Sequence, residues 1–278
     1  MPIHDQGYRR YGGRKEPPGH AWWVVAKNHI VPALRVRRFA GLLLFAWSPF
    51  VVRAVQLYVA SNFSQAAMLA AKPETFKEFL GTQQVFLFFV TIAMAGLIAD
   101  DRRVNALQVY LSRPLARSEY IVGKLVAALI FLLAVTWLPA MLLLLLQIMF
   151  AGNVAFVSKN LYLFPAITLF SLIQVFTFAF TMLALSSMSK SRRFVSIMYA
   201  GIIFFTAAMY NALRAMTGSS SFAWLSPGDC LAIIANAIFR TPSTYTVPVW
   251  AAFLSIAVLI AGSILILERR VRGVEVVT

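Results

Sequence analysis

The stretch IVGKLVAALIFLLAVTWLPAMLLLLLQIM, residues 121–149, contains one charged side chain in 29 residues. A helix needs roughly 20 predominantly apolar residues to cross the hydrocarbon core of a membrane, and the core of a water-soluble domain does not account for such a run. Residues 121–149 therefore predict a transmembrane helix. It contains Pro139, which a membrane helix tolerates where neighbouring groups satisfy the carbonyl that the proline frees.

Similar apolar runs lie on both sides of this one. The chain has 60% apolar and 13% charged residues, about half the charge of an average soluble domain. We therefore expect an all-α polytopic membrane protein with a transmembrane domain over residues 39–267. Its six predicted spans are residues 39–60, 80–99, 121–149, 162–187, 194–213 and 247–267.

The distribution of Lys and Arg predicts the orientation. With the N-terminus inside, 19 of these residues fall in cytoplasmic segments and five in external loops, and Arg53 lies within the first span. Cytoplasmic loops carry an excess of Lys and Arg, so we expect both termini to be cytoplasmic. The net charge of +15 follows this topology pattern, and no nucleic-acid partner is expected.

Four of the segments outside the predicted spans have a distinctive composition. Residues 1–20 are polar and rich in Gly and Pro, which predicts a disordered basic tail. Residues 21–38 predict an interfacial amphipathic helix, with an apolar stripe of Trp23, Ala26, Ile30, Ala33 and Leu34. Residues 268–278 form the predicted cytoplasmic tail. The external loop 214–246 contains an apolar stretch after Pro227 that is too short to span, and it is either a re-entrant helix or a helix on the outer surface.

Several kinds of chemistry are excluded by missing residues. His4, His20 and His29 all precede the first span, and Cys230 is the single cysteine. A zinc site or a Ser-His pair within the membrane therefore lacks its ligands or its base. We expect no catalytic residue, no metal and no directly bound cofactor.

The pair Gly123-Lys124 is not the end of a nucleotide-binding loop. Leu125 stands where that loop needs Ser or Thr, and Ser118 stands where it needs its first glycine. The chain is therefore not expected to hydrolyse ATP by that route.

The segment DDRRVNALQVYLSRPLARSEYIVGKL, residues 100–125, links the second and third spans. It begins with four charges at the membrane edge, and two helical turns are expected from Asn105 to Leu111. Pro114 should end them, and Ser118 is the predicted N-cap of the next helix. From the residues alone, this segment is either an ordinary positive loop or a rigid cytoplasmic knuckle. The membrane-edge charges are Asp100, Asp101, Arg102 and Arg103.

The string NALQVYLSRPLARSEYIVGKL, after the Asp pair, resembles the permeases of ABC-2 type transporters. It is most similar to the six-span, single-chain group that includes permeases of multi-copper enzyme maturation and gliding-motility systems. The resemblance extends to the basic entry segment, the six spans and the long fifth external loop with Leu225-Ser226-Pro227.

This resemblance implies a permease subunit, and specifically an exporter, in a bacterial inner membrane. It implies a homodimer or heterodimer that docks separately encoded ATPase subunits, which bind the ATP. Residues 100–124 would then form the coupling region. The coupling positions that the resemblance implies are Asn105, Leu107, Tyr110, Ser112, Arg113, Pro114, Arg117, Tyr120, Gly123 and Lys124.

Polar residues inside the spans allow two interpretations. An arginine at mid-bilayer costs roughly 2.5–3.5 kcal/mol on insertion scales, so Arg53 either reaches the interface or a partner carbonyl, or it serves a substrate or gating role. The fourth span has a polar face, which serves either helix packing or translocation. The possible translocation surface consists of Arg53, Ser171, Gln174, Thr177 and Thr181.

Two other classes of function stay open. A channel or ion-coupled carrier would need no ATPase, but it predicts ionisable groups deep in several spans. A non-transporting membrane assembly factor is the other alternative.

Overall fold

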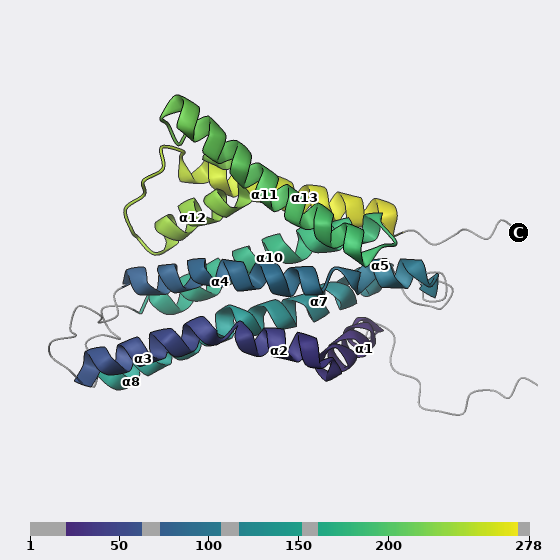
Figure 1. Cartoon of the computed structure of the whole chain (residues 1–278), viewed down its shortest axis with the longest axis horizontal. Coiled ribbons are helices and arrows are strands. Elements are labelled where there is room, and N and C mark those ends of the chain that lie inside the picture. The colour runs from purple at the N-terminus through teal and green to yellow at the C-terminus, as the bar shows by residue number, and fades with distance from the viewer. Residues whose placement is uncertain (1–20, 63–72, 107–116, 152–160, 272–278) are drawn as a thin grey trace, which may run out of the picture.

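The computed structural model describes residues 21–62, 73–106, 117–151 and 161–271, and in these ranges it contains helices and no strands. Six helical segments are long and apolar enough to cross a membrane, which confirms the predicted all-helical class and number of spans (Figure 1). They are Arg37–Asn62, Glu74–Arg103, Arg117–Phe150, Leu163–Met188, Arg192–Thr217 and Val249–Arg270.

The first three spans are each interrupted, whereas the last three are continuous. Pro49 and Pro139 lie just after two of the breaks, and a proline leaves the carbonyl four residues earlier without its amide donor. The broken spans are α2 (Arg37–Phe45) with α3 (Ser48–Asn62), α4 (Pro73–Ala93) with α5 (Gly96–Arg103), and α7 (Arg117–Val135) with α8 (Trp137–Ala151). The continuous spans are α10 (Leu163–Met188), α11 (Arg192–Thr217) and α13 (Val249–Arg270).

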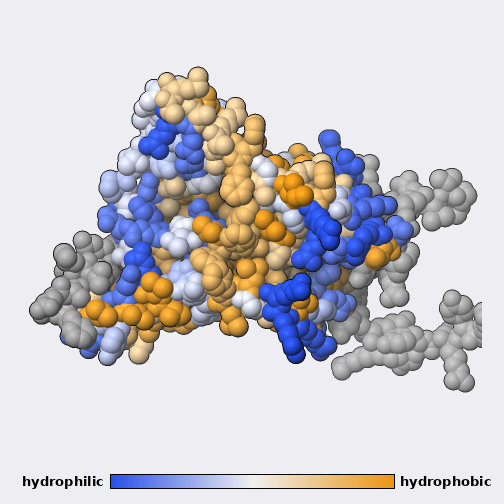
Figure 2. Space-filling model, viewed as in Figure 1, coloured by the Kyte–Doolittle hydropathy of each residue, from blue (hydrophilic) through white to orange (hydrophobic). Residues whose placement is uncertain are grey.

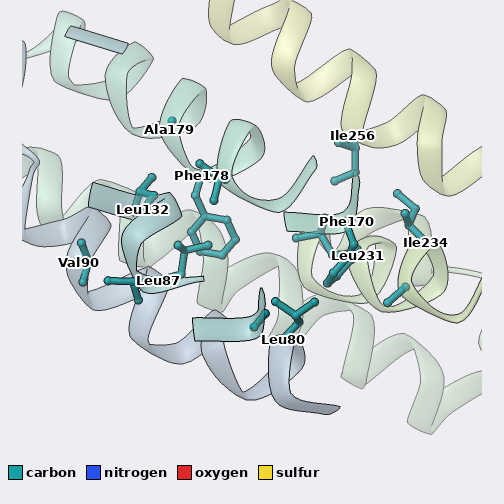
Figure 3. Close-up of a cluster of buried hydrophobic side chains, with 14 of the residues drawn as sticks. Leu80, Leu87, Val90, Leu132, Phe170, Phe178, Ala179, Leu231, Ile234 and Ile256 are labelled. Atoms are coloured by element: carbon teal, nitrogen blue, oxygen red, sulfur yellow. The ribbon is translucent and has the colours of Figure 1, made fainter. Parts of the chain in front are cut away.

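Helix α10 is the central element of the bundle. It packs against α4, α5, α7, α8, α11 and α13, and most of its side chains are buried. In Figure 1, α3 and α8 lie on one side of the bundle, and α11 and α13 lie on the other. Figure 3 shows part of the core between these layers, where Phe170 and Phe178 of α10 lie among Leu87 of α4, Leu132 of α7 and Ile256 of α13.

The segment between α11 and α13 holds a short helix, α12 (Pro227–Ile238), after a single 3₁₀ turn, η2 (Ala223–Leu225). Ser226 caps α12, since its Oγ accepts the N–H of Asp229 at 3.4 Å. The apolar side chains of α12, among them Leu231 and Ile234, are buried against the bundle rather than resting on its surface. The helix contacts α4, α10, α11 and α13.

Two predicted details between the second and third spans are wrong. Helix α7 already begins at Arg117, so Ser118 lies inside it and is not its N-cap. Asn105 has a φ of 55°, which is left-handed, so the predicted helical turns do not begin at this residue. The charges Asp100–Arg103 belong to α5, because the second helix continues beyond the predicted end of its span.

Helix α1 (Ala21–Arg35) and the C-terminal end of α13 lie at the same end of the bundle (Figure 1). Hydrophilic residues gather toward both ends, and the middle is mainly apolar (Figure 2). We call the end with α1 the basic end, because the segments there carry the described Lys and Arg residues other than Arg53, Lys77, Arg214 and Arg240.

Candidate functional site

Lys124, in the second turn of α7, is the centre of a polar network at the basic end. Its side chain is fully buried. The Nζ lies 2.5 Å from the Asp101 Oδ2 and donates to the Leu97 carbonyl oxygen at 2.5 Å. It also contacts the Nε2 of His29. An ammonium group has three protons to donate, so this arrangement satisfies all three.

The network is formed by two pairs of residues, and the members of each pair are four positions apart in the sequence. Side chains four residues apart lie on the same face of a helix, and this places Leu97 near Asp101 on α5 and Tyr120 near Lys124 on α7. The Tyr120 hydroxyl donates to the Asp101 Oδ2 at 2.8 Å, and the Lys124 Nζ lies 5.2 Å from the centre of the Tyr120 ring. Asp101 therefore holds the end of the second span against the start of the third.

Helix α1 packs against the third span through a close backbone contact. A Cβ on Gly123 would lie 2.6 Å from the Trp22 carbonyl oxygen and 2.7 Å from the Val25 Cβ. Val25 also clusters with Tyr120 and with Val271, at the end of α13. Helix α1 therefore packs directly against α7, and only glycine fits at the point of contact.

The contact face of α1 overlaps in part with its predicted apolar stripe. Ala26 is buried, and Ile30 and Ala33 pack partly buried against the core, whereas Trp23 and Leu34 are exposed. The face that α1 turns toward α7 also carries Val25 and points His29 at Lys124.

His29 is held neutral by its surroundings. Burial is the main cause that lowers its pKa to about 4; the Lys124 ammonium acts in the same direction, and Asp101 acts in the opposite direction. A neutral imidazole offers one nitrogen as an acceptor, and the Nε2 fills this role toward Lys124. The sequence alone excludes His29 as a metal ligand or a catalytic base within the membrane, but it gives no local signal that links this residue to Asp101 or Lys124.

The structure places the described coupling positions in two environments. Asn105 and Arg117 are exposed, whereas Tyr120, Gly123 and Lys124 are buried inside the bundle. The buried three are therefore placed to hold helices together rather than to touch a docked protein. The other coupling positions, Leu107, Tyr110, Ser112, Arg113 and Pro114, lie outside the described residues.

Two of the remaining membrane-edge charges, Asp100 and Arg103, lie at the surface beside this network, whereas Arg102 is half-buried. Asp100 and Arg103 form an ion pair of 3.7 Å, and both line a hollow of about 410 Å³. Its other lining residues come from the segment between α10 and α11 and from the first turn of α11. They are Lys190, Ser191, Arg192 and Arg193.

Arg53 has a charged partner on another helix. Its Nη2 lies 3.0 Å from the Glu78 Oε2 of α4, and its Nη1 donates to the Gln56 Oε1 at 3.2 Å. The partner of Arg53 is therefore the Glu78 carboxylate. The sequence predicted an interfacial position, a partner carbonyl, or a substrate or gating role.

The polar face of α10 mostly binds backbone. The hydroxyls of Thr177 and Thr181 donate to carbonyls one turn earlier on α10, each at 2.7 Å, and the Gln174 Nε2 donates to the Leu80 carbonyl of α4 at 3.3 Å. The two threonines also line an apolar cavity of about 250 Å³, but Arg53, Ser171 and Gln174 do not. The structure therefore does not bring the five predicted residues into one cavity.

The described residues contain no group of three or more His, Cys, Asp or Glu side chains that could hold a metal ion. His29 and Asp101 both face the Lys124 ammonium. The ammonium therefore occupies the position that a metal ion would need. The arrangement is suited to holding three helices together.

No protein-family model matches the chain, and no curated protein is significantly similar to it.

Proposed function

We propose that the chain is the membrane-spanning permease subunit of an ABC-2 type ATP-binding cassette transporter in a bacterial inner membrane. A separate ATPase subunit would dock on residues 100–124 and bind the ATP, and a second permease protomer would complete the transporter. The observation that supports this most directly is the buried Lys124 network, because it joins both described ends of the docking segment to α1.

In this proposal the network transmits force. Closure of the ATPase would push the segment between α5 and α7, and Asp101 and Lys124 would make the two helices move together. The helical breaks at Met94-Ala95 and at Thr136 lie between this unit and the rest of the two spans. A break in a helix is a natural place for a change of backbone angle, so the outer halves could respond by tilting. The direction of transport in this proposal is export.

Charge reversal of Arg113 and Arg117 tests the docking. The double variant Arg113→Glu/Arg117→Glu should lose co-purification with the ATPase while still inserting into the membrane. Arg269→Glu/Arg270→Glu is the matched control, since it reverses two exposed charges at the end of α13 on the same side. Unchanged recovery of the ATPase with the Arg113/Arg117 variant would contradict the proposal.

Reconstitution separates the alternative functions. A permease should transport only when its ATPase and ATP are present. Solute flux through the purified chain alone in liposomes would instead establish a channel or carrier. Stable association with other membrane proteins, without an ATPase and without flux, would establish an assembly factor.

A further inference from the structure

Two hollows at the basic end adjoin each other. The basic hollow, of about 410 Å³, is lined by Asp100, Arg103, Lys190, Ser191, Arg192 and Arg193. A second one, of about 270 Å³, also has Asp100 and Arg192 in its lining. Because they share these two residues, a single elongated molecule could occupy both. We call the second one the apolar cleft, for the composition of its walls described below.

The basic hollow has the charge pattern of an anion site. Four cationic side chains face one carboxylate, and that carboxylate, Asp100, is already paired with Arg103. The hollow also lies at the N-terminal end of the 26-residue helix α11, which Ser191 caps. The positive end of the helix dipole adds to the attraction for a phosphate group.

The apolar cleft runs between the elbow of α1 and α2 and the break between α4 and α5. Its apolar lining consists of Pro32, Ala33, Val36 and Phe39 on one side and includes Met94, Leu97 and Phe131 on the other. Asn28 and His29 also line the cleft. Hydrocarbon fits such walls better than a soluble anion does. Figure 2 shows hydrophilic surface directly beside apolar surface at this end of the molecule.

Arg192 is held in place where the two hollows meet. Its Nη2 donates to the carbonyl of Ala93, at the C-terminal end of α4. Its guanidinium is therefore positioned at the break in the second span, where Arg192 lines both hollows. A charged group fixed at the boundary between a cationic and an apolar surface matches the boundary between the headgroup and the acyl chain of a lipid.

We propose that the two hollows together bind one anionic phospholipid, with its phosphate in the basic hollow and an acyl chain in the apolar cleft. A zwitterionic lipid would leave the cationic excess of the hollow unmatched, and a free phosphate ester would leave the apolar cleft unused. Basic pockets between transmembrane helices are known positions for anionic headgroups. This proposal does not depend on the proposed transport function.

The charge test uses phosphatidylglycerol and phosphatidylethanolamine. The purified protein is delipidated, and retention of each lipid is measured by native mass spectrometry and by thermal stabilisation. Each Lys or Arg near an anionic headgroup changes affinity about fivefold. Lys190→Gln/Arg193→Gln should therefore weaken phosphatidylglycerol binding by roughly 25-fold, whereas the control Arg269→Gln/Arg270→Gln should leave it unchanged.

The position of the acyl chain is tested with two matched substitutions at exposed valines. Val36, 52% exposed, lines the apolar cleft, and Val52, 56% exposed, lies on α3 away from it. Val36→Phe should lower the stabilisation by phosphatidylglycerol, and Val52→Phe should not. Both residues are exposed, so neither substitution has to fit into the packed core.

Three results would overturn the proposal. Equal retention of the two lipids would remove the charge selectivity, and unchanged binding by Lys190→Gln/Arg193→Gln would place the lipid elsewhere. Stabilisation by soluble glycerol 3-phosphate equal to that by phosphatidylglycerol would make a free phosphate ester, rather than a lipid, the ligand.

Discussion

Lys124 illustrates the conditions under which a charged side chain can be fully buried. Removing an ammonium and a carboxylate from water costs several kcal/mol for each ion, and the pair recovers this only when its remaining hydrogen bonds are made. The Lys124 Nζ has Asp101, the Leu97 carbonyl and His29 as acceptors, and Asp101 also accepts from Tyr120. The network is therefore stable only as a complete set.

The first prediction concerns the pair itself. Lys124→Met should lower stability by about 3–5 kcal/mol, because it leaves the largely buried Asp101 carboxylate without its counter-ion. Asp101→Asn should be similarly costly, and the double variant should cost clearly less than the sum. Thermal unfolding in detergent measures all three. Additive effects of the two substitutions would show that the residues are not coupled in the folded protein.

The second prediction concerns the pH dependence of α1 docking. The folded-state pKa of His29, about 4, lies below its ordinary value of 6.5. When α1 is undocked, His29 binds more protons between these two pH values than when α1 is docked. The contribution of His29 to the docking free energy of α1 is therefore complete above pH 6.5 and decreases as the pH falls toward 4. The charged groups facing His29 are Lys124 and Asp101. Asp100 and Arg192 line the apolar cleft together with His29.

Spin labels on α1 and α7 would measure this docking as a distance distribution. We expect a single short distance at pH 7.5 and a growing longer component at pH 5. His29→Gln serves as the control, since it cannot titrate, and its distribution should be the same at both pH values. A pH response that persists in His29→Gln would assign the titration to another group.

At the scale of the helices, side chains from other helices complete the backbone hydrogen bonding of all three broken spans. The Gln83 Nε2 of α4 donates to the carbonyls of Ala46, at 3.2 Å, and of Val135, at 2.9 Å. Ser186 of α10 serves the second span, where its Oγ accepts two amides of α5 and donates to the Ala95 carbonyl at 2.7 Å. A lipid environment offers no water for these groups.

The third prediction follows from the position of Val135, four residues before Pro139. Its carbonyl lacks the helical amide that any other residue at 139 would supply. Gln83→Leu should therefore destabilise the bundle, by about 1–3 kcal/mol for the two lost hydrogen bonds. In a Pro139→Ala background the loss should be smaller, because the alanine introduced there has an amide N–H that can donate to the Val135 carbonyl. Thermal unfolding tests this, and Gln84→Leu on the next position is the control. An equal loss in both backgrounds would contradict the proposed role of Gln83.

The fourth prediction concerns the packing of α1 on α7. Gly123→Ala should displace α1, because the added methyl group would overlap the Trp22 carbonyl oxygen. Overpacking of this kind costs typically about 1–3 kcal/mol. Gly201→Ala is the matched control within α11, where a Cβ meets nothing within 4 Å. The spin-label distance between α1 and α7 should lengthen only in Gly123→Ala, and an unchanged distance would show that the two backbones are not in close contact.

At the scale of the whole molecule, the sequence predicts the spans well because each is a local property. An apolar run of sufficient length, such as α10, is visible without knowing its neighbours. The break at Met94-Ala95 is not visible in this way, since no proline lies near it. Gln83 and His29 also could not be assigned, because their partners lie 37 to 95 residues away in the chain. Their roles depend on how the helices are placed, which no short pattern encodes.

The fifth prediction concerns the orientation of the basic end, which holds α1 and the C-terminal end of α13. Because the basic end carries most of the described Lys and Arg, we expect it to face the cytoplasm. Cys230 is buried, so a Cys230→Ser background allows single exposed cysteines to report on each side. In intact cells an impermeant maleimide should label Ser61→Cys and Thr217→Cys, at the opposite end. Lys27→Cys and Arg270→Cys should react only after permeabilisation. Labelling of Lys27→Cys and Arg270→Cys from opposite sides would require an odd number of crossings, which six membrane-spanning helices cannot produce.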